Sequence, residues 1–134
     1  MARFDRSDWA KFILRAAIAG NMLFHGVHKL HAGIPGIEKL LVSRGLPEFL
    51  SHGVYVGEVL APTLMLLGVF TRPASAVFAF NMGIAVGLAH PDALFALGKH
   101  GEWQLELQSL YFFGAIVIAI IGGGKISLKR DRWN

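Results

Sequence analysis

Apolar and polar residues are grouped in long blocks along this chain. Four apolar segments stand out, at residues 9–30, 53–70, 74–89 and 107–121. With a few flanking residues, each reaches the about 20 residues that an α-helix needs to cross a bilayer. Residues 110–124 carry no charge and therefore lack the polar face that a helix of a soluble bundle needs. The pattern predicts an all-α fold, an integral membrane four-helix bundle.

The two longer connections between these segments carry helical signals of their own. The one between spans one and two opens with Pro35 and spaces its apolar residues on one helical face, which predicts a short interfacial helix in the headgroup plane. The connection after span three is predicted to form a helical turn or two after Pro91. Pro62 lies inside span two, where we expect it to kink the helix and release a carbonyl.

Composition narrows the class of protein further. Hydrophobic residues make up 54% of the 134 residues and charged residues 16%, against about a quarter charged in a soluble domain. The length allows one transmembrane domain, residues 1–134. Cysteine is absent, which excludes disulfides, thiolate zinc sites and cysteine-ligated iron–sulfur clusters. Any redox role must therefore use a cofactor or a partner.

The basic residues are unevenly distributed about the predicted spans. Four of them fall on one side, namely Lys29, Lys39, Arg44 and Lys99. Nine fall on the side of the two tails, namely Arg3, Arg6, Lys11, Arg15, Arg72, Lys125, Lys129, Arg130 and Arg132. The positive-inside rule therefore predicts a multi-pass protein with both termini in the cytoplasm, and no nucleic-acid partner. We expect Arg15 to extend toward the lipid headgroups.

Histidines and carboxylates gather at the opposite, outer end of the predicted spans. His25 lies six residues inside His31, and Glu58 six residues inside His52, so both lie about 9 Å below the entry of their helices. With one polar group from each of the other two spans, they are predicted to share one pocket, lined by His25, Glu58, His90 and Glu106.

Span one offers further polar groups to this pocket. Asn21, His25, His28 and Lys29 fall within about a third of the helical circle. We expect this face to point into the bundle, because an ionisable group facing hydrocarbon costs about 2.5 kcal/mol or more. The pocket is then expected to hold a quinone headgroup, a transferred proton or a metal ion. An equally weighted alternative is a buried His–Glu hydrogen-bond pair that only stabilises the packing of the helices.

Two further predictions concern the metal ligands of this pocket and the protonation of Glu58. A metal ion would take His25, His28 and Glu58 as its ligands. Without a cationic partner, a buried Glu58 would be protonated and able to donate to a quinone carbonyl.

The order of motifs resembles the DoxX family of small bacterial membrane proteins. The resemblance rests on RAAIAGNMLFHGVHKL, RGLP, GEVLAPTLMLLGVFTRP, a span that ends in AH, GEWQLELQSLYFF and GGGKISLKR. It implies four helices, a place in the bacterial cytoplasmic (inner) membrane and an association with quinone-linked redox systems.

Three functions follow as hypotheses. The leading one is a small accessory subunit of a quinone-linked oxidoreductase, whose pocket positions a quinone or relays protons. The alternatives are a non-catalytic membrane scaffold and a metal-handling membrane protein that uses the histidines. The expected partners are the lipid bilayer and a membrane or redox protein, and homo-oligomerisation stays open.

Overall fold

The computed structural model describes residues 3–134, and its regular elements are helices. The described part of the chain has no strand beyond an isolated bridge between Leu97 and Trp103. The predicted all-α class is therefore confirmed. The elements are α1 Arg6–Ala32, α2 Pro35–Ser43, η1 Glu48–His52, α3 Gly53–Tyr55, η2 Val56–Leu60, α4 Ala61–Leu67, α5 Thr71–Ala89, η3 Pro91–Phe95 and α6 Glu106–Ile121.

Helix α1 has a well-defined start and end. Asp5 caps it in a reciprocal pair of hydrogen bonds: the Asp8 amide donates to Asp5 over 2.9 Å, and the Asp5 amide donates to Asp8 over 3.1 Å. Gly33, with a φ of 79°, ends the helix and donates its amide to the Lys29 carbonyl over 2.8 Å. α1 therefore extends beyond the predicted span at both ends.

The second long helical run, Glu48–Leu67, contains the π-helical turn η2. Pro62 follows this turn and has no amide hydrogen for the carbonyl of Glu58, four residues earlier. The Ala61 amide instead donates to the Val56 carbonyl, five residues earlier. The disturbance expected near Pro62 is thus a widened turn, a feature frequent at functional sites.

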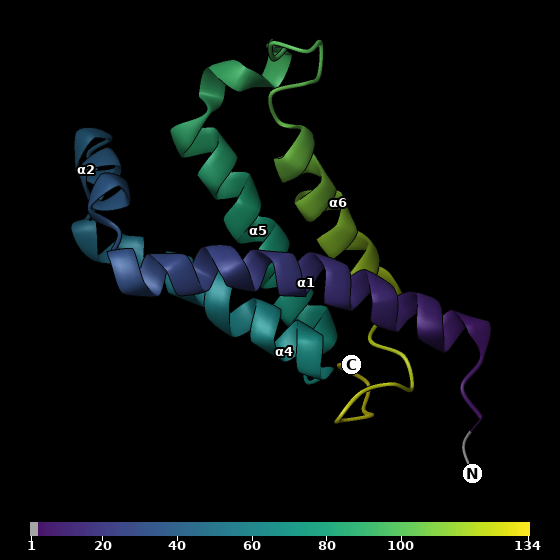
Figure 1. The fold of residues 1–134 in the computed structure, drawn as a ribbon. Helices are drawn as coiled ribbons and strands as arrows, with labels where there is room; N and C mark the ends of the chain where they lie inside the picture. The colour runs from purple at the N-terminus through teal and green to yellow at the C-terminus, as the bar shows by residue number, and fades with distance from the viewer. Residues whose placement is uncertain (1–2) are drawn as a thin grey trace.

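The long helices pack against one another in succession. α1 lies against α4, α4 also lies against α5, and α5 lies against α6 (Figure 1). In the same view α2 lies beside the C-terminal end of α1 and the first residues of the Glu48–Leu67 run. The α5–α6 connection lies at the top of the picture. One buried core joins these four helices, formed by Ala19, Met22, Ala61, Met65, Ala74, Phe78, Ala79, Met82, Tyr111, Ala115 and Ile118.

Two continuous helices of residues 3–134 are long and apolar enough to cross a membrane, Glu48–Leu67 and α5. Helix α6 is apolar but shorter, at 16 residues, and α1 is not among the candidates.

The predicted helix after Pro35 is present as α2, and the turn after Pro91 is present as η3. The sequence therefore predicted the positions of these helices.

Arg15 does not reach toward a membrane surface. Its side chain is 0% exposed, and its Nη1 donates to the carbonyls of Met65 over 2.6 Å and Leu66 over 3.0 Å. Its Nη2 donates to the Ile126 carbonyl. The expectation of an extended Arg15 is wrong because α4 ends at Leu67, and the carbonyls of its last turn need donors that the helix cannot supply.

The C-terminal segment folds back over the end of the bundle where Arg15 contacts the last turn of α4 (Figure 1). The Lys125 amide donates to Asp8 Oδ1 over 3.0 Å, and the Arg72 amide donates to the Trp133 carbonyl over 3.0 Å. The start of α1, the α4–α5 turn and the C-terminus therefore lie at one end of the molecule. The Lys125 amide also lowers the pKa of Asp8 below its usual value, because it stabilises the ionised carboxylate.

Candidate functional site

A cavity of about 770 Å³ lies among α1, α2, the Glu48–Leu67 run, α5 and α6. Apolar side chains form most of its wall, including Leu41 of α2, Val77 of α5 and Leu107 of α6. Its titratable and amide groups are few: His25, Lys29, Glu58, Asn81, His90, Gln108 and Tyr111. An apolar pocket with a few convergent polar groups is the usual form of a small-molecule site.

Lys29 and Glu58 form the charged centre of this cavity. Lys29 Nζ lies 2.7 Å from Glu58 Oε1. Glu58 is 6% exposed, and its second oxygen, Oε2, is buried with no hydrogen-bond partner in the described residues. The carboxylate thus has a cationic partner, whereas the protonation predicted for Glu58 assumed that none was present.

Two glycines allow the backbone around Glu58 to approach its neighbours. A Cβ on Gly26 of α1 would overlap the carbonyl of Glu58 and lie 2.8 Å from Val59 Cγ2. A Cβ on Gly57 would overlap the side chain of Asn81 on α5. The turn η2 is therefore held closely between α1 and α5, and this fixes the position of the Glu58 carboxylate.

His25 lies on the cavity wall beside aromatic side chains. Its ring meets Tyr111 edge-on, with 6.2 Å between the ring centroids. Tyr111 in turn lies against Phe78 at 6.1 Å. This packing orients the imidazole and the phenol toward one region of the cavity.

Other predicted site residues lie outside this cavity. Asn21 is exposed and donates to the Ala17 carbonyl of its own helix over 2.8 Å. His28 is exposed and does not line the cavity, whereas His90 does line it, directly after the end of α5. The predicted arc on span one is thus divided: His25 and Lys29 face the cavity, and Asn21 and His28 do not.

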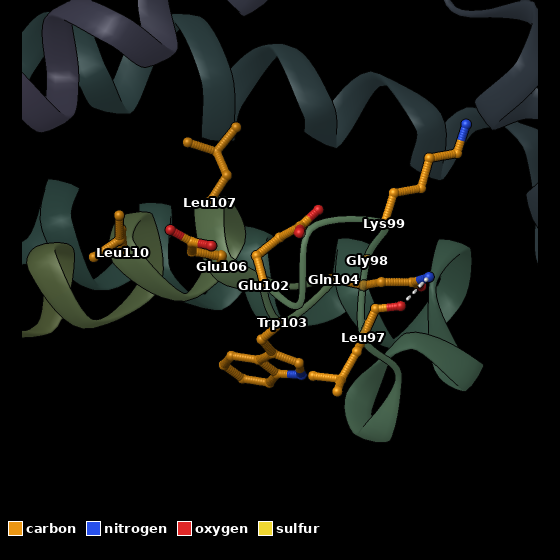
Figure 2. A pocket seen from close by; sticks show the side chains of 9 residues that line it. All are labelled: Leu97, Gly98, Lys99, Glu102, Trp103, Gln104, Glu106, Leu107 and Leu110. Atoms are coloured by element: carbon orange, nitrogen blue, oxygen red, sulfur yellow. Dashed lines mark hydrogen bonds between the residues drawn. The ribbon is translucent and has the colours of Figure 1, made fainter.

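Glu106 lines a second, more open hollow of about 600 Å³ at the α5–α6 connection. Figure 2 shows Glu106 there with Glu102 and Trp103. Glu102 accepts the His100 amide over 2.9 Å, and Trp103 Nε1 donates to the Leu94 carbonyl over 2.8 Å. The four predicted pocket residues are therefore not together: three line the cavity, and Glu106 belongs to this second hollow.

The metal hypothesis finds no assembled ligand set. Residues 3–134 contain no group of three or more histidine, cysteine, aspartate or glutamate side chains that could hold a metal ion. His25 and Glu58 line the cavity, but His28 does not. The described residues thus do not bring the three proposed ligands to one site.

Three polar cavity residues were missed by the sequence analysis. Asn81 is the only amide within the apolar segment of α5, a signal that could have been read. Gln108 and Tyr111 lie in the first turns of α6, and only the packing of α6 against α5 brings them to the cavity.

A comparison with protein-family models places the chain in a family. The DoxX model matches residues 10–91, more than half of the chain. The chain belongs to the DoxX family. The match contains His25, Lys29, Glu58 and His90 but ends before α6, so it is shorter than the resemblance drawn from the sequence. The curated proteins and the solved structures gave no match.

Proposed function

We propose that this DoxX protein is a four-span subunit of the bacterial cytoplasmic membrane that binds a quinone in its cavity, in association with a quinone-linked oxidoreductase. The observation that carries the proposal is the largely apolar cavity of about 770 Å³ with a single charged pair, Lys29 and Glu58. Its volume lies within the range of about 300–1,000 Å³ typical of ligand sites.

The outer surface supports a membrane location. Large apolar side chains are exposed on several helices, among them Phe24 at 79%, Phe113 at 60% and Ile120 at 67%. Exposed apolar surface of this extent is typical of proteins that contact lipid. The basic tails lie at the end of the bundle where the C-terminal segment packs, and the positive-inside rule assigns that end to the cytoplasm.

The cavity suits an amphiphilic ring compound with a hydrocarbon tail. Leu50, Phe80 and Ile84 line the cavity and are also exposed, so its wall is continuous with the apolar outer surface. A tail leaving by this route would stay in the hydrocarbon. Lys29 lines the cavity with a side chain that is 30% exposed, and its ammonium group offers hydrogen-bond donors to the ring carbonyls.

In this function the quinone supplies the electron-transfer chemistry. The chain binds and orients it: Lys29 donates a hydrogen bond at the polar end, Glu58 holds the Lys29 ammonium group in place, and the ring of Tyr111 supplies an apolar contact. The electron donor would be a membrane or redox protein partner.

The test is the quinone content of protein extracted with its native lipid. In a cavity-filling variant, Ala85→Phe, bound quinone should fall well below that of the unchanged protein, because Ala85 lines the cavity. Ala76→Phe is the matched control, since Ala76 is exposed on the same helix and does not line it. Quinone at the ratio of the bulk lipid in all three proteins would reject quinone binding and favour the scaffold alternative.

A further inference from the structure

Helix α1 has two opposite faces of different character. The buried face carries Asp8, Arg15, Ala19, Met22 and Gly26. The opposite face, which we call the outer face of α1, occupies an arc of about 100° and carries Ile13, Ala17, Gly20, Asn21, Phe24 and His28. Five of these residues are exposed, and a Cβ added to Gly20 would have nothing within 4 Å. The rest of the described chain therefore leaves this face open.

Asn21 is the polar centre of the outer face. It lies about 22 Å along the helix axis from Arg6 and about 16 Å from Ala32, so its short side chain does not reach the headgroups at either end. One N–H of its carboxamide donates to the Ala17 carbonyl over 2.8 Å, and no described residue donates to its Oδ1. The second N–H and Oδ1 thus face hydrocarbon without water or a protein partner, which is unfavourable.

We propose that the outer face of α1 binds the same face of a second copy of this chain, with the two Asn21 carboxamides hydrogen-bonded to each other. The inference rests on the membrane placement of α1 in the proposed function, and not on the quinone. A carboxamide carries both donors and an acceptor, so two identical ones pair reciprocally. Copies of one chain share one orientation in a membrane, so a twofold axis along the membrane normal brings Asn21 of both copies to the same depth.

The residues around Asn21 allow two helices to approach closely. Ala17 and Gly20 are small, and small residues are typical of helix interfaces in membranes. The steps from Ala17 to Asn21, Phe24 and His28 are four, three and four residues, the repeat of a left-handed helix pair. Lipid tails offer no hydrogen bond to Asn21, and an unrelated span would need a matching polar group at the same depth. A second copy presents that group by identity.

The first experiment is oxidative crosslinking of Ala17→Cys in native membranes, which is specific because the chain has no other cysteine. A disulfide needs Cα atoms within about 7 Å, and the proposed pair brings the two Ala17 positions together, so we expect a product of two chains. Phe113→Cys on α6 is the control, since Phe113 is 60% exposed but lies on another helix, and it should stay monomeric. Absence of the product from Ala17→Cys would overturn the proposal. A product with a different protein, which is the alternative occupant of this face, would overturn it too.

The second experiment measures the association constant of the cysteine-free chain in detergent by sedimentation equilibrium. Asn21→Leu should lower it about threefold to thirtyfold, the factor that one or two hydrogen bonds in a membrane are worth, whereas Asn21→Gln keeps a donor and an acceptor and should retain most of it. An apolar contact without the amide pair predicts the opposite, so equal or tighter association of Asn21→Leu would overturn the proposal. Asn21 does not line the cavity, and bound quinone should be the same in both variants as in the unchanged protein. A monomer that retains quinone would therefore reject this inference alone and leave the proposed function standing.

Discussion

Lys29 Nζ and Glu58 Oε1 lie 2.7 Å apart and join helix α1 to the π-helical turn of the next long helix. The two partners are unequally buried: the Lys29 side chain is 30% exposed and that of Glu58 9%. Because burial sets the cost of an unpaired charge, the two residues should not respond equally to substitution. This asymmetry provides a direct test of the pair.

Lys29→Met should destabilise the protein more than Glu58→Gln. The first change leaves a buried carboxylate unpaired, at a cost of about 2–4 kcal/mol; the second leaves a lysine that water can still reach, at about 1 kcal/mol. The measurement is unfolding in detergent, followed by circular dichroism. The double variant should lose less than the sum of the two single losses, and strict additivity would show that the pair is not coupled.

Gly26→Ala should destabilise the junction between α1 and η2 by about 1–3 kcal/mol, because the added methyl group overlaps the Glu58 carbonyl. Gly20→Ala is the matched control. It lies on the same helix, and a methyl group added there would have nothing within 4 Å, so this variant should be neutral or slightly stabilising. Equal thermal midpoints for the two variants would contradict the close contact at Gly26.

Arg15→Lys should not replace Arg15, although it keeps the charge. The guanidinium reaches the Met65, Leu66 and Ile126 carbonyls from two nitrogens, whereas an ammonium group presents a single nitrogen. We expect a loss of about 1–3 kcal/mol in unfolding free energy and earlier proteolysis of the C-terminal segment. Arg6→Lys, at an exposed position, is the control and should leave both measurements unchanged.

The Asp8–Lys125 contact should weaken in acid. The pKa of Asp8 is lowered in the folded protein, chiefly by the Lys125 amide, so the contact stabilises the fold above the usual value of 3.8 and is lost as the pH falls through the folded value. Asp8→Asn should therefore lower the thermal midpoint near neutral pH. The difference from the unchanged protein should shrink below about pH 3.8, and a difference independent of pH would rule out the ionised carboxylate as its source.

The sequence predicted the helices well because the apolar blocks are long and their ends carry proline and glycine. It also predicted that His25 and Glu58 lie at a similar depth on neighbouring helices, since depth along a helix follows from residue counting, and both residues line the cavity. Which side of a helix faces the cavity is harder to predict. Asn21 and His28 share an arc with His25, yet only the packing against α6 and η2 decides which part of that arc meets the cavity.

The surroundings of Arg15 and Glu106 were likewise not predictable from helical periodicity. Helical periodicity gives no information on the C-terminal segment that folds back to Arg15, because this contact joins residues 111 positions apart. Glu106 begins α6 at a suitable depth, but the irregular connection before α6 directs it to the other hollow. Long-range packing of irregular segments is the information that the pattern of residues lacks.

The proposed topology can be tested by labelling, because the sequence has no cysteine and every introduced one is unique. Ser43→Cys on α2 and His100→Cys on the α5–α6 connection are exposed and should react with a membrane-impermeant maleimide in intact spheroplasts. Ser7→Cys, beside the basic start of α1, should react only after permeabilisation, since the positive-inside rule places it in the cytoplasm. The cysteine-free chain controls for background. Labelling of Ser7→Cys and Ser43→Cys under the same condition would place both ends of α1 on one side, and α1 could then not be a span.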